Sequence, residues 1–102
     1  MTATSPSGAA DTAELLQAVV LAVPGVRSLY RGDFGEIGTY LPGRTVPGIR
    51  QDDHGTEIHL VVDDRADLQV VAAAVHRAAA TVVPGPVHVH IDDLAPAPRP
   101  VS

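Results

Sequence analysis

Two segments of the chain repeat apolar residues with the spacing of an amphipathic helix. In residues 11–23 the apolar stripe consists of Leu15, Leu16, Val19, Val20 and Val23. In residues 68–82 it consists of Leu68, Val71, Ala72, Val75, Ala79 and Val82. Proline and glycine follow both segments, and Asp63–Asp67 supplies capping side chains for the second. Each segment therefore predicts a helix with one apolar face to bury.

The clearest strand pattern lies at residues 56–62, where apolar and polar side chains alternate. This alternation points Ile58, Leu60 and Val62 to one face of a sheet. The preceding turn, Asp52–Gly55, holds residues that favour a tight reversal, so residues 46–51 predict the partner strand of a hairpin. Within this segment, Pro47 and Gly48 mark either an edge position or a bulge. Shorter apolar segments predict further strands at 26–31, 37–41 and 87–91.

The order of these segments predicts an α/β two-layer sandwich. A strand, a helix and a strand in succession predict a crossover between two parallel strands. We therefore expect a small mixed sheet of three to four strands, covered on one face by two helices, in the order α-β-β-β-α-β. Residues 11–94 form the single predicted domain, with a disordered tail at 1–10 and a Pro-rich tail at 95–102.

Composition narrows the function classes. The formal net charge is −5, all seven basic residues are Arg, and there is no Cys. Disulfides and thiolate zinc sites are thus excluded, and an acidic chain without a basic cluster argues against nucleic-acid binding. No apolar run approaches the roughly 18 residues of a membrane span, and the N-terminus lacks the pattern of a secretory signal. We expect a cytoplasmic protein without direct membrane insertion.

A glycine-dense segment, Gly32–Gly38, contains G-x-x-G twice, which is similar to the phosphate-clamping loop of KH domains. Its variable positions include Asp33 and Glu36, whose negative charge would repel a phosphate. We favour a flexible loop here.

Three histidines offer a possible metal site. If the apolar residues of 56–62 and 87–91 face the helices, then His59, His88 and His90 share the uncovered face of the sheet. A His-x-His pair on one strand with a third His on another suits zinc, nickel or copper. The alternative is a merely solvated polar face.

No catalytic set is apparent. The pairs Asp52-Asp53, Asp63-Asp64 and Asp92-Asp93 fall at turns or strand ends, where water keeps both carboxylates ionised and a capping role is favoured. Neither a nucleophile motif nor a phosphate- or dinucleotide-binding motif is present. We expect a protein that is not an enzyme and needs no cofactor.

One loop has the residue types of a protein interface: Tyr40, Leu41, Pro42 and Arg44. The alternative is a hairpin connection in which Tyr40 and Leu41 close the end of the core. Both interpretations remain open at this point.

The order and spacing of several short segments resemble the alkaline shock protein family of bacterial envelope-stress proteins, in particular its short actinobacterial members. The segments that carry the resemblance are Val23-Pro24-Gly25-Val26, Gly38–Arg44, Val46–Arg50, Glu57–Val62 and Val87–Leu94. With the two helices they extend from about Asp11 to Leu94.

The resemblance implies a non-enzymatic protein of the envelope or alkaline stress response. It implies self-association as a homo-oligomer, or docking to a membrane-anchored protein partner that would hold a cytoplasmic chain at the membrane. A His-based metal-binding module remains the alternative function.

Overall fold

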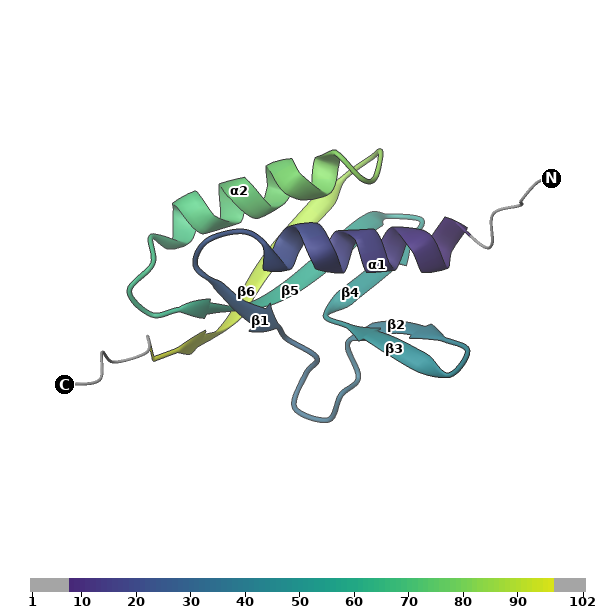
Figure 1. Cartoon of the computed structure of the whole chain (residues 1–102), viewed down its shortest axis with the longest axis horizontal. Coiled ribbons are helices and arrows are strands. Elements are labelled where there is room, and N and C mark those ends of the chain that lie inside the picture. Colours follow the sequence, from purple (N-terminus) through teal and green to yellow (C-terminus); the bar gives the residue numbers. More distant parts are fainter. Residues whose placement is uncertain (1–7, 97–102) are drawn as a thin grey trace.

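The computed structural model describes residues 8–96, without the side chains of residues 8–11 and Arg44. Over this range the elements follow one another as α1 (Gly8–Leu21), β1 (Val26–Leu29), β2 (Gly38–Leu41), β3 (Arg44–Pro47), β4 (Ile49–Asp52), β5 (Gly55–Asp63), α2 (Leu68–Ala80) and β6 (Val87–Ala95) (Figure 1). Helix α1 begins at Gly8, three residues before the start predicted at Asp11. Of the predicted tails, 1–10 and 95–102, only residues 1–7 and 97–102 lie outside the described residues.

Strand β5 is the centre of the main sheet. Along one edge it pairs in parallel with β6, from Thr56↔Val87 to Asp63↔Ala95. Along the other edge it pairs antiparallel with two short strands in turn, β4 beside its first half and β1 beside its second. Strands β2 and β3 form a separate antiparallel hairpin. The predicted parallel pair and the predicted turn at Asp52–Gly55 are both confirmed.

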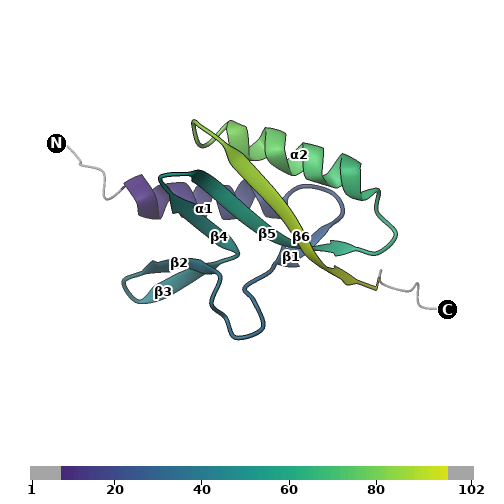
Figure 2. The ribbon, with the colours of Figure 1, turned by 180° about the vertical axis from the view of Figure 1, so that it is seen from behind.

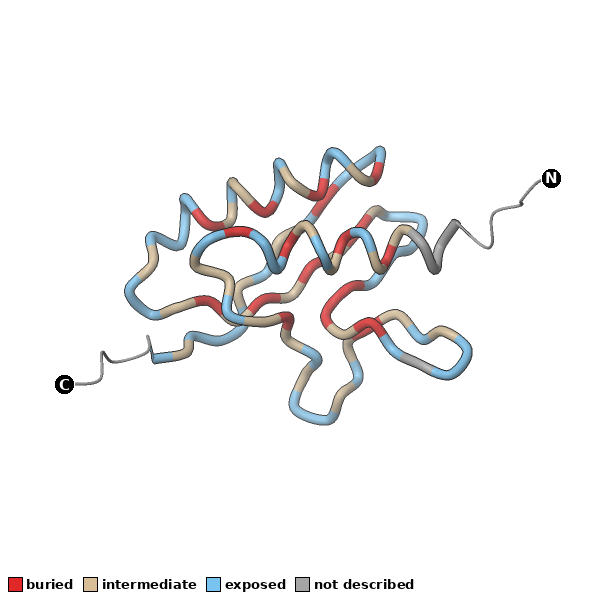
Figure 3. Tube along the Cα trace, in the orientation of Figure 1, coloured by how far each residue is buried: buried red, intermediate tan, exposed pale blue. Residues whose placement is uncertain are grey.

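Both helices lie on the same face of the main sheet (Figures 1 and 2). The core lies between these layers, as the buried positions along the trace show (Figure 3). Its largest fully buried side chains are Leu16, Val20, Ile49, Ile58, Leu60, Val62 and Val75. The predicted two-layer α/β architecture is therefore confirmed, and Ile58, Leu60 and Val62 occupy the predicted face of β5.

The apolar face of α1 differs from the predicted stripe. Ala13, Leu16, Val20 and Val23 are buried, whereas Leu15 is 55% exposed. Leu15 lies one position from Leu16, which rotates it by about 100° around the helix. The face follows the spacing of residues 13, 16 and 20, with Val19 partly buried beside it and Leu15 outside it.

Five strands separate the two helices, two more than in the predicted order α-β-β-β-α-β and one more than the four predicted segments at 26–31, 37–41, 46–51 and 56–62. Segment 26–29 does pair with β5 as β1, and the segment predicted as one strand at 46–51 is divided at Gly48. Gly48 has φ +76°, a conformation that breaks a strand and that only glycine adopts readily. Its N–H donates to the carbonyl oxygen of Ile37 (2.9 Å), and its own carbonyl accepts from the N–H of His59 (2.8 Å). Gly48 is thus the point where β4, β5 and the 30–37 loop meet.

Strand β6 continues four residues beyond the predicted end at Ile91. Its register with β5 shifts between Leu60 and Val61, so that Ile91 pairs with Leu60 and Asp93 pairs with Val61. The intervening residue, Asp92, is the extra residue of this bulge. Residue Ala95, which the sequence places in the C-terminal tail, pairs with Asp63.

Neither of the helices in the described part of the chain is both long enough and apolar enough to cross a membrane.

Candidate functional site

The outer face of the sheet, opposite the helices, carries a cluster of polar side chains on β5 and β6. Residues of β5 alternate between buried and partly exposed, so Glu57 and His59 point away from the core. The parallel register places His88 opposite Glu57 and His90 opposite His59. We call Glu57, His59, His90 and Asp92 the outer-face cluster.

His59 is the centre of the outer-face cluster. Its Nδ1 lies 2.6 Å from Oδ2 of Asp92, and its Nε2 lies 3.2 Å from Oε1 of Glu57. Its ring stacks on the ring of His90, with centroids 4.4 Å apart and planes 7° from parallel. The His59 side chain is only 12% exposed, so these partners largely fix its orientation.

The structure brings together two of the three predicted histidines. Three side chains can each offer one ligand atom within 4.8 Å of the other two: Glu57, His59 and His90. His88 is not a member of this group. Asp92 was missed because the predicted strand ended at Ile91. The missing signal was in the sequence, since the alternation of His88 and His90 continues to Asp92 on the same face.

Carboxylates outside the cluster have local structural roles. Asp52 Oδ1 accepts a hydrogen bond from the N–H of His54 in the β4–β5 turn (2.7 Å), and Asp93 Oδ1 accepts from the N–H of Leu94 (2.9 Å). Asp63 forms an ion pair with Arg27 (2.8 Å). Of the paired carboxylates, Asp92 alone joins the outer-face cluster.

The loop at residues 30–37 begins beside the outer-face cluster, at Tyr30. Tyr30 donates its backbone N–H to the carbonyl oxygen of His59 (2.7 Å) and its hydroxyl to Asp33 Oδ1 (2.8 Å). The hydrogen bond to Asp33 raises the pKa of Tyr30 above 10.0, and partial desolvation and the charges of Asp33, Asp92 and Asp93 raise it further.

A raised pKa of Tyr30 predicts a loss of stability at alkaline pH. The folded state holds the phenolic proton more tightly than the unfolded state, so this contribution is complete below pH 10 and falls as pH rises through the folded pKa of Tyr30. We expect Asp33→Asn to lower the pKa of Tyr30 and to reduce this alkaline loss. An NMR titration of the tyrosine ring carbons checks the first expectation, and a Tyr30 pKa unchanged by Asp33→Asn would contradict it.

The predicted interface residues separate into two groups. Tyr40 is 65% exposed, and its hydroxyl donates to the carbonyl oxygen of Gly35 (3.0 Å). Leu41 packs against the core, and Pro42 is exposed in the β2–β3 turn. The structure does not describe the side chain of Arg44. Leu41 therefore helps to close the core, whereas Tyr40 belongs to the surface.

The largest exposed apolar side chain near Tyr40 is Phe34, at the tip of the 30–37 loop. Its side chain is 93% exposed. Hydrogen bonds from the Phe34 N–H to Glu36 Oε1 (3.0 Å) and from the Gly35 N–H to the Gly32 carbonyl (3.3 Å) hold the loop around it. Sequence reasoning treated this segment as flexible and missed Phe34, although it is the single Phe of the chain.

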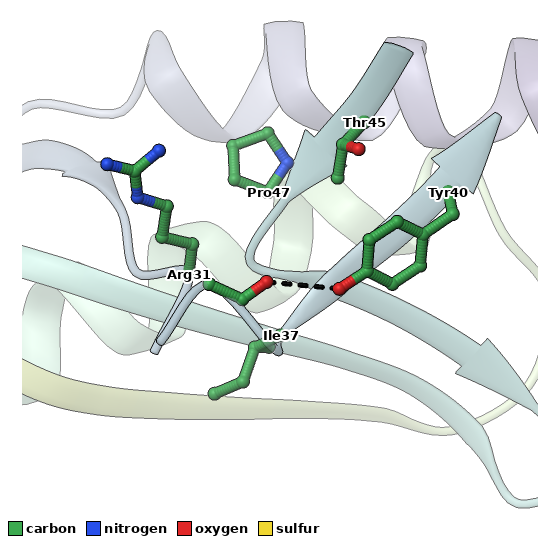
Figure 4. A pocket seen from close by; sticks show the side chains of 6 residues that line it. Arg31, Ile37, Tyr40, Thr45 and Pro47 are labelled. Carbon is green, nitrogen blue, oxygen red and sulfur yellow. Dashed lines mark hydrogen bonds between the residues drawn. The ribbon is translucent and has the colours of Figure 1, made fainter. Parts of the chain in front are cut away.

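A shallow pocket lies between the loop and the β2–β3 hairpin (Figure 4). Gly35, the residue after Phe34, is part of its lining. Its volume is about 220 Å³, and it is lined by Arg31, Gly35, Ile37, Tyr40, Thr45 and Pro47. In the view of Figure 4, Arg31 and Tyr40 stand at opposite ends of the pocket. Small-molecule sites usually measure roughly 300–1,000 Å³, so this pocket suits a single side chain better than a whole ligand. Together, Phe34 and this pocket form what we call the Phe34 surface.

Comparison with protein-family models, with curated proteins and with solved structures finds no match for this chain.

Proposed function

We propose that this chain is a non-enzymatic interaction protein that binds a second copy of itself through the Phe34 surface. The observation that supports the proposal is an almost fully exposed Phe34 next to a partly apolar pocket with room for one aromatic side chain. The resemblance to the alkaline shock protein family supplies the physiological setting, a cytoplasmic role in envelope stress.

Apolar burial favours the association. Transfer of a Phe side chain from water to an apolar site contributes about 1.5–3 kcal/mol. Ile37, Tyr40 and Pro47 provide an apolar lining for it. In the described residues Phe34 has the greatest exposure of the large apolar side chains, at 93%. A partner that covers Phe34 therefore removes the most unfavourable apolar exposure on this surface.

The charges around the loop and the pocket are complementary. Asp33 and Glu36 flank Phe34 on the loop, and Arg31 lines the pocket. When Phe34 of one copy enters the pocket of another, the acidic loop approaches Arg31. Complementary charges of this kind orient the encounter and disfavour other registers.

Symmetry favours a closed dimer. The loop and the β2–β3 hairpin lie side by side, joined by the Tyr40–Gly35 hydrogen bond (Figures 1 and 2). Since Phe34 and the pocket belong to one surface, a two-fold axis lets each copy insert its Phe34 into the other. The contact is small, so we expect a weak dimer with a dissociation constant in the micromolar to submillimolar range.

Sedimentation equilibrium across a concentration series tests the proposal. We expect the wild-type chain to dimerise and Phe34→Ala to weaken the dimer at least about tenfold, equivalent to about 1.4 kcal/mol. The Phe34 side chain is almost fully exposed, so its removal should leave the fold unchanged by circular dichroism.

Val70→Ala is the matched control, because Val70 is 63% exposed on α2, in the helix layer. It should leave the dimer unchanged. A wild-type chain that stays monomeric at millimolar concentration would refute self-association. If such a monomer instead binds a membrane-anchored protein, and Phe34→Ala abolishes that binding, the Phe34 surface docks a different partner from the one proposed.

A further inference from the structure

We infer that Glu57, His59 and His90 bind a divalent transition-metal ion of the zinc, nickel or copper type on the outer face of the sheet. This site is independent of the proposed dimer, since none of its residues belongs to the Phe34 surface. It revises the predicted set of three histidines by replacing His88 with Glu57.

The spacing of the donor atoms fits a tetrahedral ion. With ligand distances of about 2.0–2.2 Å, two neighbouring ligands of zinc lie roughly 3.3 Å apart. Nε2 of His59 and Oε1 of Glu57 are 3.2 Å apart, so this pair already has the required separation. Donors from all three residues lie within 4.8 Å of one another.

Asp92 prepares His59 as a ligand. Both ring nitrogens of His59 lie against carboxylate oxygens, Nδ1 against Asp92 and Nε2 against Glu57, and ionised carboxylates only accept protons. A metal ion that enters between His59 and Glu57 takes the place of a proton on Nε2, while Asp92 keeps the other ring proton on Nδ1. A carboxylate that holds the far nitrogen of a metal-binding histidine also raises its basicity and fixes its ring.

His90 completes the set from the neighbouring strand. Its ring lies parallel to that of His59, and an ion cannot lie in both ring planes while the rings remain stacked. His90 is exposed, so its ring has room to turn about its side-chain torsions toward the ion. Parallel pairing of β5 and β6 holds the two backbones at a fixed separation throughout. Water would occupy the remaining ligand position.

The donor types select the class of metal. Two imidazoles with one carboxylate suit zinc and its neighbours, whereas calcium and magnesium require mainly oxygen ligands. Three ligands on an open sheet face predict moderate affinity, with a dissociation constant for zinc on the order of 1–50 μM.

Isothermal titration calorimetry of the full, untagged chain with zinc chloride near neutral pH tests the site. We expect one ion per chain. His90→Ala and Glu57→Gln should each weaken binding at least about tenfold, and Asp92→Asn should weaken it by roughly 10-fold or more through the orientation of His59. Circular dichroism checks that each variant retains the wild-type fold.

His88→Ala is the matched control, because His88 lies on the same strand and the same face but outside the cluster. It should bind zinc within about twofold of wild type. The inference is overturned if wild type shows no saturable binding tighter than about 100 μM, or if His88→Ala loses as much affinity as His90→Ala.

Discussion

Replacement of Gly48 by alanine is expected to destabilise the fold by about 3 kcal/mol or more. Two effects contribute. A non-glycine residue at φ +76° is strained by roughly 1–2 kcal/mol. An added Cβ would also lie 2.8 Å from Cβ of Leu29 and 2.9 Å from the carbonyl oxygen of His59, distances that force neighbouring backbone to move. Overpacking of this kind costs about 1–3 kcal/mol.

Gly43→Ala separates the two contributions. Gly43 has nearly the same backbone angle, φ +78°, but a Cβ there meets no atom within 4 Å. It should therefore lose only the roughly 1–2 kcal/mol that comes from strain. Urea denaturation followed by circular dichroism measures both variants. Equal losses at the two positions would contradict the close approach of β1, β4 and β5 at Gly48.

Leu60→Ala is expected to cost about 2–5 kcal/mol, a large part of the total stability of a domain of this size. Leu60 is fully buried on the central strand, on the face that both helices cover. Its truncation removes apolar contacts and leaves a cavity, because the surrounding sheet and helices relax only partly into the space. Thermal and urea denaturation provide the measurement.

The control for Leu60 is its neighbour Val61, which points to the opposite face of β5 and is partly exposed. Val61→Ala should cost no more than about 1 kcal/mol. If Val61→Ala were the more destabilising change, the helices would have to cover the other face of the sheet.

The parts of the fold that were predictable are those with a strong internal period. The alternation of residues 56–62 placed Ile58 and Leu60 correctly, and the helix–strand order predicted the parallel pairing of β6. In segment 46–51, Pro47 and Gly48 are residue types that mark an edge position or a bulge. The complete division at Gly48 was not predictable, because its positive φ depends on where β1 and β5 lie around it. Leu15 was misplaced because two adjacent apolar residues satisfy the same helical spacing until a sheet selects one of them.

For the outer face, alternation predicted that His59 and His90 would share a side, but their stacking depends on the register of β5 with β6. The same register places His88 opposite Glu57, yet the described ligand atoms that come together are those of Glu57, His59 and His90. Asp92 was predictable by extending the alternation of His88 and His90 by two residues, whereas its place at a β-bulge was not.

Phe34 was missed for a different reason. The high glycine content predicted a flexible loop, whereas hydrogen bonds of Asp33 and Glu36 hold the loop together around an exposed Phe34.

The central claim is that Phe34 of one copy lies in the pocket of another. The most direct measurement is an isotope-filtered NOE experiment on a mixture of labelled and unlabelled chains, at a concentration where the dimer predominates. We predict intermolecular cross-peaks between the Phe34 ring and the side chains of Ile37 and Pro47, which line the pocket. Intermolecular cross-peaks confined to another surface, such as the outer edge of β6, would contradict the account.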